Sequence, residues 1–362
     1  MKRRDILLRS ATLPVVAASA LATPALAQSS TKVRWRMPTS FPTGLATLYG
    51  GATFLAERVA ALTDGAFEIT PYAGGEIVPP LGVLEAAQNG TVEAGFTAGF
   101  YYLGKNPALM FDTGVPFGMS PRQHNAWISQ GGGLEMMREL YAEFNVINFA
   151  AGNSGAQMGG WYRKPIDTLE DIKGLRIRAA GLVGSVFAEL GAVPQSIPGS
   201  DLYPAMERGA LDAVEFVGPY DDERLGFQKV AKYYYAPGVL ELGASICLIA
   251  NMDAYNELPE TFKQVLQAAS AEANTEMLAR YDSLNIEALR RLIGSGVELR
   301  SWSEEIMLAM QAATQKLLDE EASKDARFKD IHDKWKAFRD DQILWSSVND
   351  GAAQTFLAGN RG

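Results

Sequence analysis

The feature that most constrains the fold of this chain is an unbroken helical pattern that begins at Pro259 and ends at Gly294. Proline is favoured at the first turn of a helix and glycine at its end, so both bounds carry the expected residue types. About 35 residues with a rise of 1.5 Å each make a helix roughly 50 Å long, which exceeds the width of one small domain. We therefore expect this helix to span two lobes of one protein.

The chain before this helix alternates between strand and helix patterns. Apolar side chains alternate at residues 32–37, recur with a helical period at 45–62, and alternate again near Phe67. A short helix pattern at 83–88 leads to a strand pattern at 92–96. This β-α-β-α-β order is typical of a layered α/β domain. The later strand patterns are at residues 158–162, 174–179, 240–251 and 297–302.

Two segments 119 residues apart in the sequence are similar to each other. Residues 84–96 read LEAAQNGTVEAGF and residues 203–215 read YPAMERGALDAVE, so that Gly90 matches Gly209 and Glu93 matches Asp212. Each segment is typical of a helix, a glycine that ends it and a buried strand. Such turns are common, so the match has two interpretations. It is either coincidental or the mark of two related lobes, whose strand ends would face a ligand cleft.

We predict an α/β fold with two lobes, hinge strands and a long helix that spans both. Lobe I would hold residues 28–152 and about 242–275, and lobe II residues 153–241 and about 276–340. Residues 341–362 would form a C-terminal helix. Because this tail is rich in apolar side chains, either the protein's own surface or a second subunit that exchanges its tail must cover it.

The first 27 residues are typical of a cleaved export signal. A basic start with Arg3 and Arg4 precedes an apolar stretch, and an A-x-A end closes it at Ala27. The two arginines also fit a twin-arginine pattern, although ordinary signals often carry two arginines as well. No other segment has the roughly 18 apolar residues that a membrane span needs. We therefore expect the protein to act in the periplasm.

Composition argues against several classes of function. The net charge is −9 and no basic stripe is visible, so nucleic-acid binding is not expected. One cysteine, Cys247, and two histidines, His124 and His332, make a disulfide, a structural zinc site or a Cys/His nucleophile improbable. A bound metal would be held mainly by oxygen, which favours Na⁺ or Ca²⁺. No nucleophile elbow, phosphate loop or dinucleotide fingerprint is present.

Charged side chains at strand ends are candidates for a binding site. Arg178 ends a strand pattern, and its planar guanidinium can bind a carboxylate through two parallel hydrogen bonds. Glu215 ends an apolar strand and Glu241 begins another, and a buried carboxylate is costly unless it is paired or bound to a metal. A cation would relieve the repulsion between two such glutamates and an anionic ligand. The alternative for each of the three residues is an ordinary salt bridge.

Uncharged side chains add to the candidate site. The run NSGAQMGGW from Asn153 carries amides, including Gln157, beside glycines that allow the backbone to approach a ligand closely. Tyr101 and Tyr102 follow a strand end, where aromatic rings would wall a small pocket. The alternatives are a polar turn for the first group and ordinary packing for the second.

These segments together resemble the periplasmic solute receptors of tripartite ATP-independent (TRAP) transporters, the DctP-type family. The matches are residues 173–178, 202–216, 215–222 and 153–161, and the likeness covers essentially the whole chain after the signal. They are most similar to the TakP-like subgroup, which binds small 2-oxo or 2-hydroxy monocarboxylates. The resemblance implies a two-lobed periplasmic-binding-protein fold. It further implies a receptor rather than an enzyme, which delivers its ligand to a membrane permease, and a homodimer formed by exchange of a C-terminal helix.

The resemblance also implies roles for single residues. Arg178 would pair with the ligand carboxylate, and Asn153, Gln157 and the Tyr101–Tyr102 region would contact the ligand. The cation would be held by the side chains of Gln157, Glu215 and Glu241 and by the main-chain carbonyl of Phe216, where relatives often carry tryptophan. Because Glu241 adds a full charge, we expect Ca²⁺ rather than Na⁺. Two alternatives remain, a receptor for a larger organic acid or osmolyte and an exported metal-assisted enzyme with Glu215 or Glu241 as base.

Overall fold

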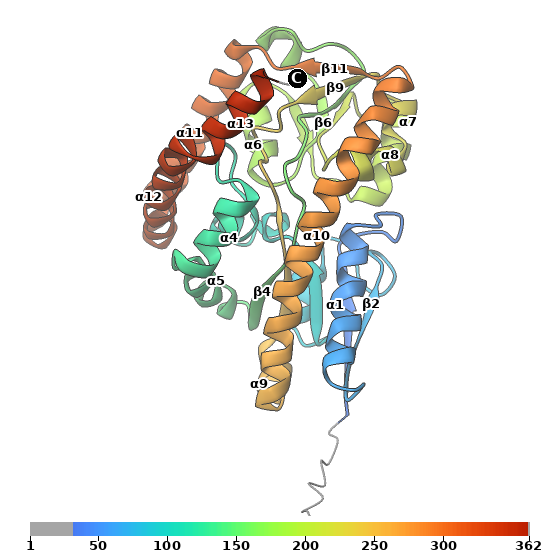
Figure 1. Ribbon diagram of the computed structural model, residues 1–362, viewed down its shortest axis with the longest axis vertical. Coiled ribbons are helices and arrows are strands. Elements are labelled where there is room, and N and C mark those ends of the chain that lie inside the picture. The colour runs from blue at the N-terminus through green and yellow to red at the C-terminus, as the bar shows by residue number, and fades with distance from the viewer. Residues whose placement is uncertain (1–31, 361–362) are drawn as a thin grey trace, which may run out of the picture. The chain divides into compact units, whose positions relative to one another are not determined.

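The computed structural model describes residues 32–360, and from Lys32 onward the chain forms one compact unit (Figure 1). The predicted export signal, with its twin-arginine pair, lies outside the described residues and stays a prediction. Within the described part, no helix has both the length and the apolar character needed to cross a membrane.

The strands of the described residues form a two-, a three- and a six-stranded sheet. In the first, β1 (Val33–Pro38) pairs in parallel with β2 (Phe67–Tyr72). In the second, β10 (Ser245–Asn251) lies antiparallel between β3 (Ala94–Thr97) and β4 (Val146–Asn153). The third has the order β11-β9-β5-β8-β6-β7. Its strands are β5 (Gly160–Tyr162), β6 (Arg176–Arg178), β7 (Val193–Gln195), β8 (Ala213–Val214), β9 (Tyr233–Ala236) and β11 (Glu298–Ser301).

Helices cover these sheets, and α10 is much the longest of those described. The α-helices are α1 (Leu48–Leu62), α2 (Val83–Gln88), α3 (Met110–Thr113), α4 (Pro121–Gln130), α5 (Gly133–Ala142), α6 (Gly181–Glu189), α7 (Leu202–Glu207), α8 (Pro219–Leu225), α9 (Met252–Asn256), α10 (Glu260–Gly294), α11 (Glu304–Lys324), α12 (Ala326–Val348) and α13 (Asp350–Gly359). Short 3-10 turns are η1 (Gly99–Tyr102), η2 (Pro107–Leu109), η3 (Leu169–Ile172), η4 (Gly199–Asp201) and η5 (Phe227–Lys229).

Helix α10 confirms the predicted long helix, with 35 residues directly after Pro259. It packs against α1 and β4 and also against α8, and Figure 1 shows it crossing the face of the molecule past all three. The side chain of Met277 fills the space beside Gly51 of α1 and Gly152 of β4, which leaves no room for a Cβ at either glycine. One helix therefore supports elements that belong to different sheets.

The two similar segments have the same local structure, which favours related halves over coincidence. Gly90 has φ +67° and Gly209 has φ +72°, and each follows a six-residue helix and precedes a strand. The residue after each glycine donates its N–H to the same acceptor, the carbonyl of Ala86 or of Ala205. The left-handed backbone that ends each helix is the conformation that glycine adopts without steric cost.

The acidic residue of each segment also binds an arginine in the same way. Glu93 accepts hydrogen bonds from the Nε and Nη2 of Arg36 in β1, at 3.1 and 2.6 Å. Asp212 accepts the matching bonds from Arg176 in β6, at 2.8 and 2.6 Å. The backbone N–H of each arginine donates to the same carboxylate. In each half, therefore, a bidentate ion pair joins the arginine of a strand, β1 or β6, to the acidic residue three positions after the glycine.

Some predicted elements differ from the structure at their ends. The strand pattern at 240–251 becomes β10 only from Ser245, because Glu241 lies in a turn where its N–H donates to the carbonyl of Gly238. Gly243 follows, packed so closely against the ring of Pro121 that a Cβ would lie 2.7 Å from its Cγ. Glu241 therefore precedes the strand instead of beginning it.

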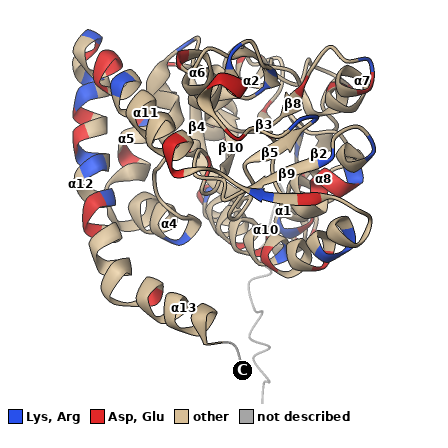
Figure 2. Cartoon of the chain, turned by 90° about the horizontal axis from the view of Figure 1, so that it is seen from above, with Lys and Arg blue, Asp and Glu red and all other residues tan. Residues whose placement is uncertain are grey.

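The C-terminal tail forms two helices where one was predicted. Helix α12 continues without interruption past residue 341 and ends at Val348, and α13 follows after Asn349. Trp335 is buried against Phe111 and Phe338 is partly buried, but beyond Phe338 the large apolar side chains are exposed. These exposed residues are Ile343, Leu344, Trp345, Val348, Phe356 and Leu357. Figure 2 shows α13 with few charged residues, in contrast to the alternating charges of α12.

Candidate functional site

A small enclosed cavity lies where the three-stranded and six-stranded sheets meet. A water-sized sphere can occupy about 20 Å³ of it, which is room for about one water molecule. Its walls come from the N-terminal region, from β10 and from loops of the six-stranded sheet. The lining residues are Phe41, Leu48, Phe100, Tyr101, Ser154, Gln157, Arg178, Phe216, Val217, Glu241, Ala244 and Ile246. Sequence prediction had singled out Tyr101, Gln157, Arg178, Phe216 and Glu241, and the structure brings these five together.

Arg178 lies at the end of β6 with only 3% of its surface exposed. Its Nη1 donates to the carbonyl of Glu215 at 2.7 Å and its Nε to the carbonyl of Ile197 at 3.2 Å. The guanidinium stacks on the ring of Phe216, 5.0 Å from the ring centre. A guanidinium has five N–H donors, and these two bonds use two of them. Arg178 is therefore held in place without a bidentate carboxylate partner, unlike Arg176, which pairs with Asp212.

Glu215 is the carboxylate nearest to Arg178, but the two do not form a close pair. The distance from Arg178 Nη1 to Glu215 Oε2 is 3.9 Å, and neither carboxylate oxygen of Glu215 has a hydrogen-bond partner among the described residues. Burial raises the pKa of Glu215 well above its ordinary range, the nearby Glu241 raises it further, and Arg178 opposes the rise. Burial also raises the pKa of Glu241, against the effect of Arg178. One guanidinium therefore faces two buried carboxylates.

The amide side chains beside these carboxylates each have an atom without a partner. Gln157 donates from Nε2 to Ser154 Oγ at 2.9 Å, while its Oε1 is buried and unpaired in the described structure. Asn153 accepts the N–H of Gly155 at 2.9 Å, while its Nδ2 is buried and likewise unpaired. Buried polar atoms without partners are uncommon and call for an explanation. Gln157 lines the cavity and has a free acceptor, whereas Asn153 is absent from the lining, although its neighbour Ser154 belongs to it.

The two predicted tyrosines point to different surroundings. Tyr101 lines the cavity, and its pKa is raised by burial and lowered in part by the nearby Arg178. The hydroxyl of Tyr102 bonds instead to Thr97 Oγ1 at 2.8 Å and to the N–H of Leu84, and Tyr102 is absent from the lining. The structure therefore does not bring Tyr102 to the site. The sequence does not indicate that residues 99–102 form a 3-10 turn, so it could not predict which of the two tyrosines faces the cavity.

The donor set suits a hard cation. The unpaired oxygens of Glu215 and Gln157 are buried near Glu241, and oxygen donors of this kind are preferred by Ca²⁺ and Na⁺. A cation would also neutralise the excess of one carboxylate over the single guanidinium. Within residues 32–360, no three His, Cys, Asp or Glu side chains gather into a metal cluster, so amide and carbonyl oxygens must complete any such site.

Several wall residues were missed by sequence analysis. Phe41, Leu48, Ala244 and Ile246 also line the cavity. They are ordinary apolar residues, and the sequence pattern indicates only that Leu48 belongs to a helix at 45–62. Nothing in their local pattern distinguishes a cavity wall from a core position, because only tertiary packing brings them to Arg178.

Comparison with known proteins identifies the family of the chain. The family model for bacterial extracellular solute-binding proteins, family 7 (DctP), matches residues 41–325. A monocarboxylate 2-oxoacid-binding periplasmic protein of Nostoc sp. is 47% identical over the full length of both chains.

Solved structures with similar chains contain ligands. A TRAP transporter solute-binding protein from Bordetella bronchiseptica is 48% identical, with a TM-score of 0.89, and covers 91% of this chain and 98% of its own. It is described as a mixed-occupancy dimer with copurified calcium and picolinate. Two relatives, from Colwellia psychrerythraea with calcium and pyruvate and from Pseudoalteromonas atlantica with sodium and pyruvate, are each 34% identical with a TM-score of 0.87. Each covers 90% of this chain and 99% of its own.

The match to these structures confirms the predicted two-lobed α/β fold with a long helix. The lobe boundaries predicted from the sequence stay predictions. Given a family model that spans most of its length and relatives of 47% and 48% identity, the chain belongs to the DctP family of bacterial extracellular solute-binding proteins, the receptors of TRAP transporters.

Proposed function

We propose that this chain is the receptor for a small 2-oxo or 2-hydroxy monocarboxylate, which it captures together with Ca²⁺ or Na⁺ and hands to a membrane permease. The observation that carries the proposal is the buried guanidinium of Arg178, which has no close carboxylate partner and faces an enclosed cavity.

Three kinds of contact would hold the ligand. Arg178 offers its remaining N–H donors to the carboxylate, as a fork that fits two oxygens. Asn153 offers its unpaired Nδ2 to an oxygen on the neighbouring carbon. Phe100, Tyr101 and Ile246 exclude water, which strengthens both interactions.

The cation would be held by Gln157, Glu215 and Glu241 side chains and by the Phe216 carbonyl. When bound it supplies positive charge that offsets the second carboxylate and attracts the ligand oxygens. Glu241 contributes a further negative charge to the donor set, and a doubly charged ion gains more from this than a singly charged one. We therefore propose Ca²⁺ as the preferred ion.

Capture requires the walls of the cavity to move apart, since the cavity as it stands has room for about one water molecule. Strands β4 and β10 and helix α10 connect the two sides and are the places where a hinge can act. Binding shifts the balance toward the closed form by the difference in ligand affinity between the two forms. No bond of the ligand is broken, so we propose a receptor without turnover.

A thermal-shift panel tests the ligand class. Pyruvate, lactate and 2-oxobutyrate, each with CaCl2, should raise the Tm, while a sugar acid and ectoine should not. Arg178→Ala should lose binding of the same acids by calorimetry, and mass spectrometry should recover the ligand unchanged. Equal binding by Arg178→Ala, or conversion of the ligand, would contradict the proposal.

We further propose that the chain forms a homodimer through its tail. The apolar side chains of 343–357 named above are exposed, with Leu344 at 65% and Trp345 at 54%. Trp345 also borders a hollow of about 600 Å³ between α4, α10 and the C-terminal helices. Covering this surface with a second copy would remove it from water. The dimer described for the Bordetella bronchiseptica relative supports this proposal.

A further inference from the structure

The hydroxyl group of Ser154 lies where the β4–β10 ladder ends and the cavity begins. The ladder's last pair is Asn153 with Ser245. Ser154 and Ala244 extend it by one step, because the N–H of Ser154 donates to the carbonyl of Ala244 at 2.9 Å and the N–H of Ala244 donates to Ser154 Oγ, also at 2.9 Å. Ser154 is 1% exposed and lines the cavity. Its hydroxyl is therefore held in place by the backbone of the sheet.

The hydrogen-bonding capacity of this hydroxyl is fully used. Ser154 Oγ donates its hydrogen to the carbonyl of Gly155 at 3.1 Å. It accepts one hydrogen from the N–H of Ala244 and another from Gln157 Nε2, each at 2.9 Å. A serine hydroxyl has one hydrogen to donate and two lone pairs that accept. While the two backbone bonds are kept, Ser154 can act toward Gln157 only as an acceptor.

This arrangement decides which end of the Gln157 amide is left free. The end that meets Ser154 has to be the NH2 group, because an oxygen there would face a hydroxyl with no hydrogen to spare. The free end is therefore Oε1, which is buried and has no partner among the described residues. A buried acceptor without a donor calls for an explanation. A cation in the cavity that Gln157 lines would provide one, since amide oxygens bind hard cations.

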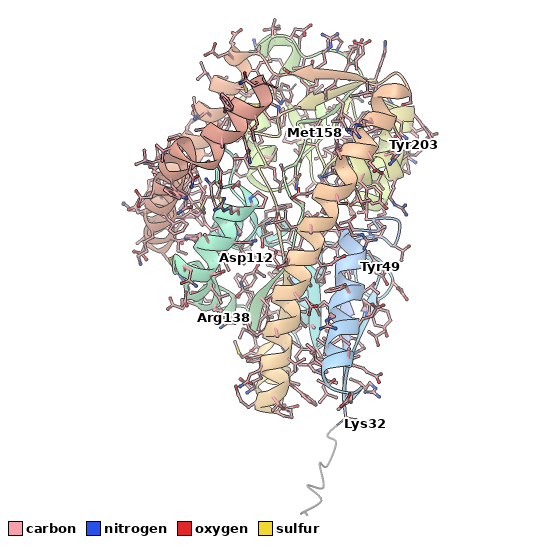
Figure 3. The ribbon with its side chains drawn as sticks, viewed as in Figure 1. Lys32, Tyr49, Asp112, Arg138, Met158 and Tyr203 are labelled. Carbon is pink, nitrogen blue, oxygen red and sulfur yellow. The ribbon has the colours of Figure 1, made fainter. Side chains whose placement is uncertain are left out.

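The backbone that carries Gln157 is fixed on both sides of it. On one side, Gly155 has φ +68°, a left-handed turn that glycine adopts without steric cost, directly after Ser154. On the other side, the N–H of Met158 donates to the carbonyl of Val217, after β8, at 3.0 Å. Figure 3 labels Met158 in the half of the molecule that holds the six-stranded sheet. With the backbone held, the orientation of the Gln157 amide depends on Ser154.

We infer that Ser154 orients the amide of Gln157, holding the NH2 group so that the oxygen stays available to the cation. Ser154 is a positioning residue and not a cation ligand, because its hydroxyl has no lone pair left. The inference deepens the proposed function and rests on it for the cation. The orientation of the amide follows from hydrogen bonds within the chain.

A double-mutant cycle tests whether Ser154 acts through the amide. Ser154→Ala should raise the Kd for CaCl2, measured by calorimetry, about 10- to 100-fold, as expected when a group that orients a metal ligand is lost. Combined with Gln157→Glu, the same change should raise the Kd less than about twofold. The reason is that both ends of a carboxylate are oxygens, so its orientation no longer matters.

Thr63→Ala is the matched control. The hydroxyl of Thr63 also donates to a carbonyl, that of Val59 at 2.8 Å, and accepts a backbone N–H, that of Phe67 at 3.1 Å, but it bonds to no side chain of the described residues. Thr63→Ala should lower the Tm, as Ser154→Ala does, and leave the Kd for CaCl2 unchanged. An equal rise in Kd from Ser154→Ala with and without Gln157→Glu would assign Ser154 a structural or direct ligand role and refute the inference.

A second measurement requires no cation. In NMR spectra of the cation-free chain, the NH2 group of Gln157 can be identified because its signals are lost in Gln157→Glu. Ser154→Ala should speed the exchange of these hydrogens with water about tenfold, since the NH2 group loses its acceptor, whereas Thr63→Ala should not change it. Unchanged exchange in Ser154→Ala would show that the hydroxyl does not hold the amide, and the inference would be wrong.

The outcomes separate this inference from the proposed function. If the unsubstituted chain binds neither CaCl2 nor NaCl but exchange of the Gln157 NH2 group still depends on Ser154, the proposed cation is wrong and the orienting role stands. If CaCl2 binds and the cycle shows no coupling between the two positions, the cation proposal stands and the orienting role is wrong.

Discussion

A single added methyl group should reveal how tightly the cavity must close. Gly181, the first residue of α6, has φ +57°, and a Cβ built there would lie 3.0 Å from the Cβ and 3.3 Å from the Cγ of Phe100. Phe100 lies in η1, which packs against α6, and lines the cavity. Gly174 offers a matched control, with φ +71° and nothing within 4 Å of its Cβ position.

Substitution by alanine has the same backbone cost at Gly181 and Gly174 but a different packing cost. Placing alanine in the left-handed region costs about 1 to 2 kcal/mol at either position. At Gly181 the new Cβ also presses on Phe100, which has little freedom because it packs edge-on against Tyr101, 4.7 Å between ring centres. Overpacking of this kind costs about 1 to 3 kcal/mol, and it falls on the closed form alone. The Kd of Gly181→Ala should therefore rise about 5- to 150-fold.

Calorimetry with pyruvate and CaCl2, alongside thermal unfolding of the ligand-free variants, tests this reasoning. Both variants should lose a similar amount of Tm without ligand, and only Gly181→Ala should bind more weakly. A Kd that is the same in the two variants would show that α6 and Phe100 do not press together when the ligand binds, and the closure argument would fail.

Three further predictions concern charge and association. Glu215→Gln should abolish the rise in Tm that CaCl2 produces. It should not destabilise the cation-free chain, because it leaves one carboxylate, Glu241, for one guanidinium. An undiminished effect of CaCl2 on the Tm would show that Glu215 does not belong to the cation site. The pKa of Asp222 is raised to about 7 by burial, so it stays protonated in the folded chain where the unfolded chain has released its proton. The free energy of unfolding should therefore fall relative to that of Asp222→Asn as pH rises from 4 to 7, by roughly 4 kcal/mol at about 1.4 kcal/mol per pH unit. If urea unfolding gave the same difference between the two proteins at every pH in this range, the prediction would be wrong. Leu344→Ser with Trp345→Ser should convert a dimer to a monomer by light scattering, while Leu308→Ser, equally exposed on α11, should not; retention of the dimer would rule out the tail interface.

Sequence patterns located most of the fold because they depend on local chemistry. Pro259 and Gly294 bound α10 as predicted, and Ser303 accepts the N–H of Ile306 at the start of α11. Thr168 and Asp171 form a capping box at the start of η3. Each of these signals lies within a few residues of the feature that it specifies, which is why periodicity and capping rules are sufficient.

The site was predictable only on the side that carries charge. Arg178, Glu215 and Glu241 stood out because buried ionisable groups at strand ends require a partner. The apolar wall opposite them did not, since Phe41 and Ile246 look like any core residue until the chain folds. The hydrogen bond from Arg224 to the carbonyl of Gly44 was hidden for the same reason, because the two residues are 180 positions apart in the sequence.

The two matching ion pairs, Arg36–Glu93 and Arg176–Asp212, allow the two halves to be compared position by position. Two positions after Arg36 the first half has Pro38, which brings neither charge nor an N–H donor, whereas two positions after Arg176 the second half has Arg178. The two halves thus differ at this position although their ion pairs match. If the proposed anion binds at Arg178, its counter-charge belongs to the second half alone, and we expect the anion to dock on that half before the first half covers it.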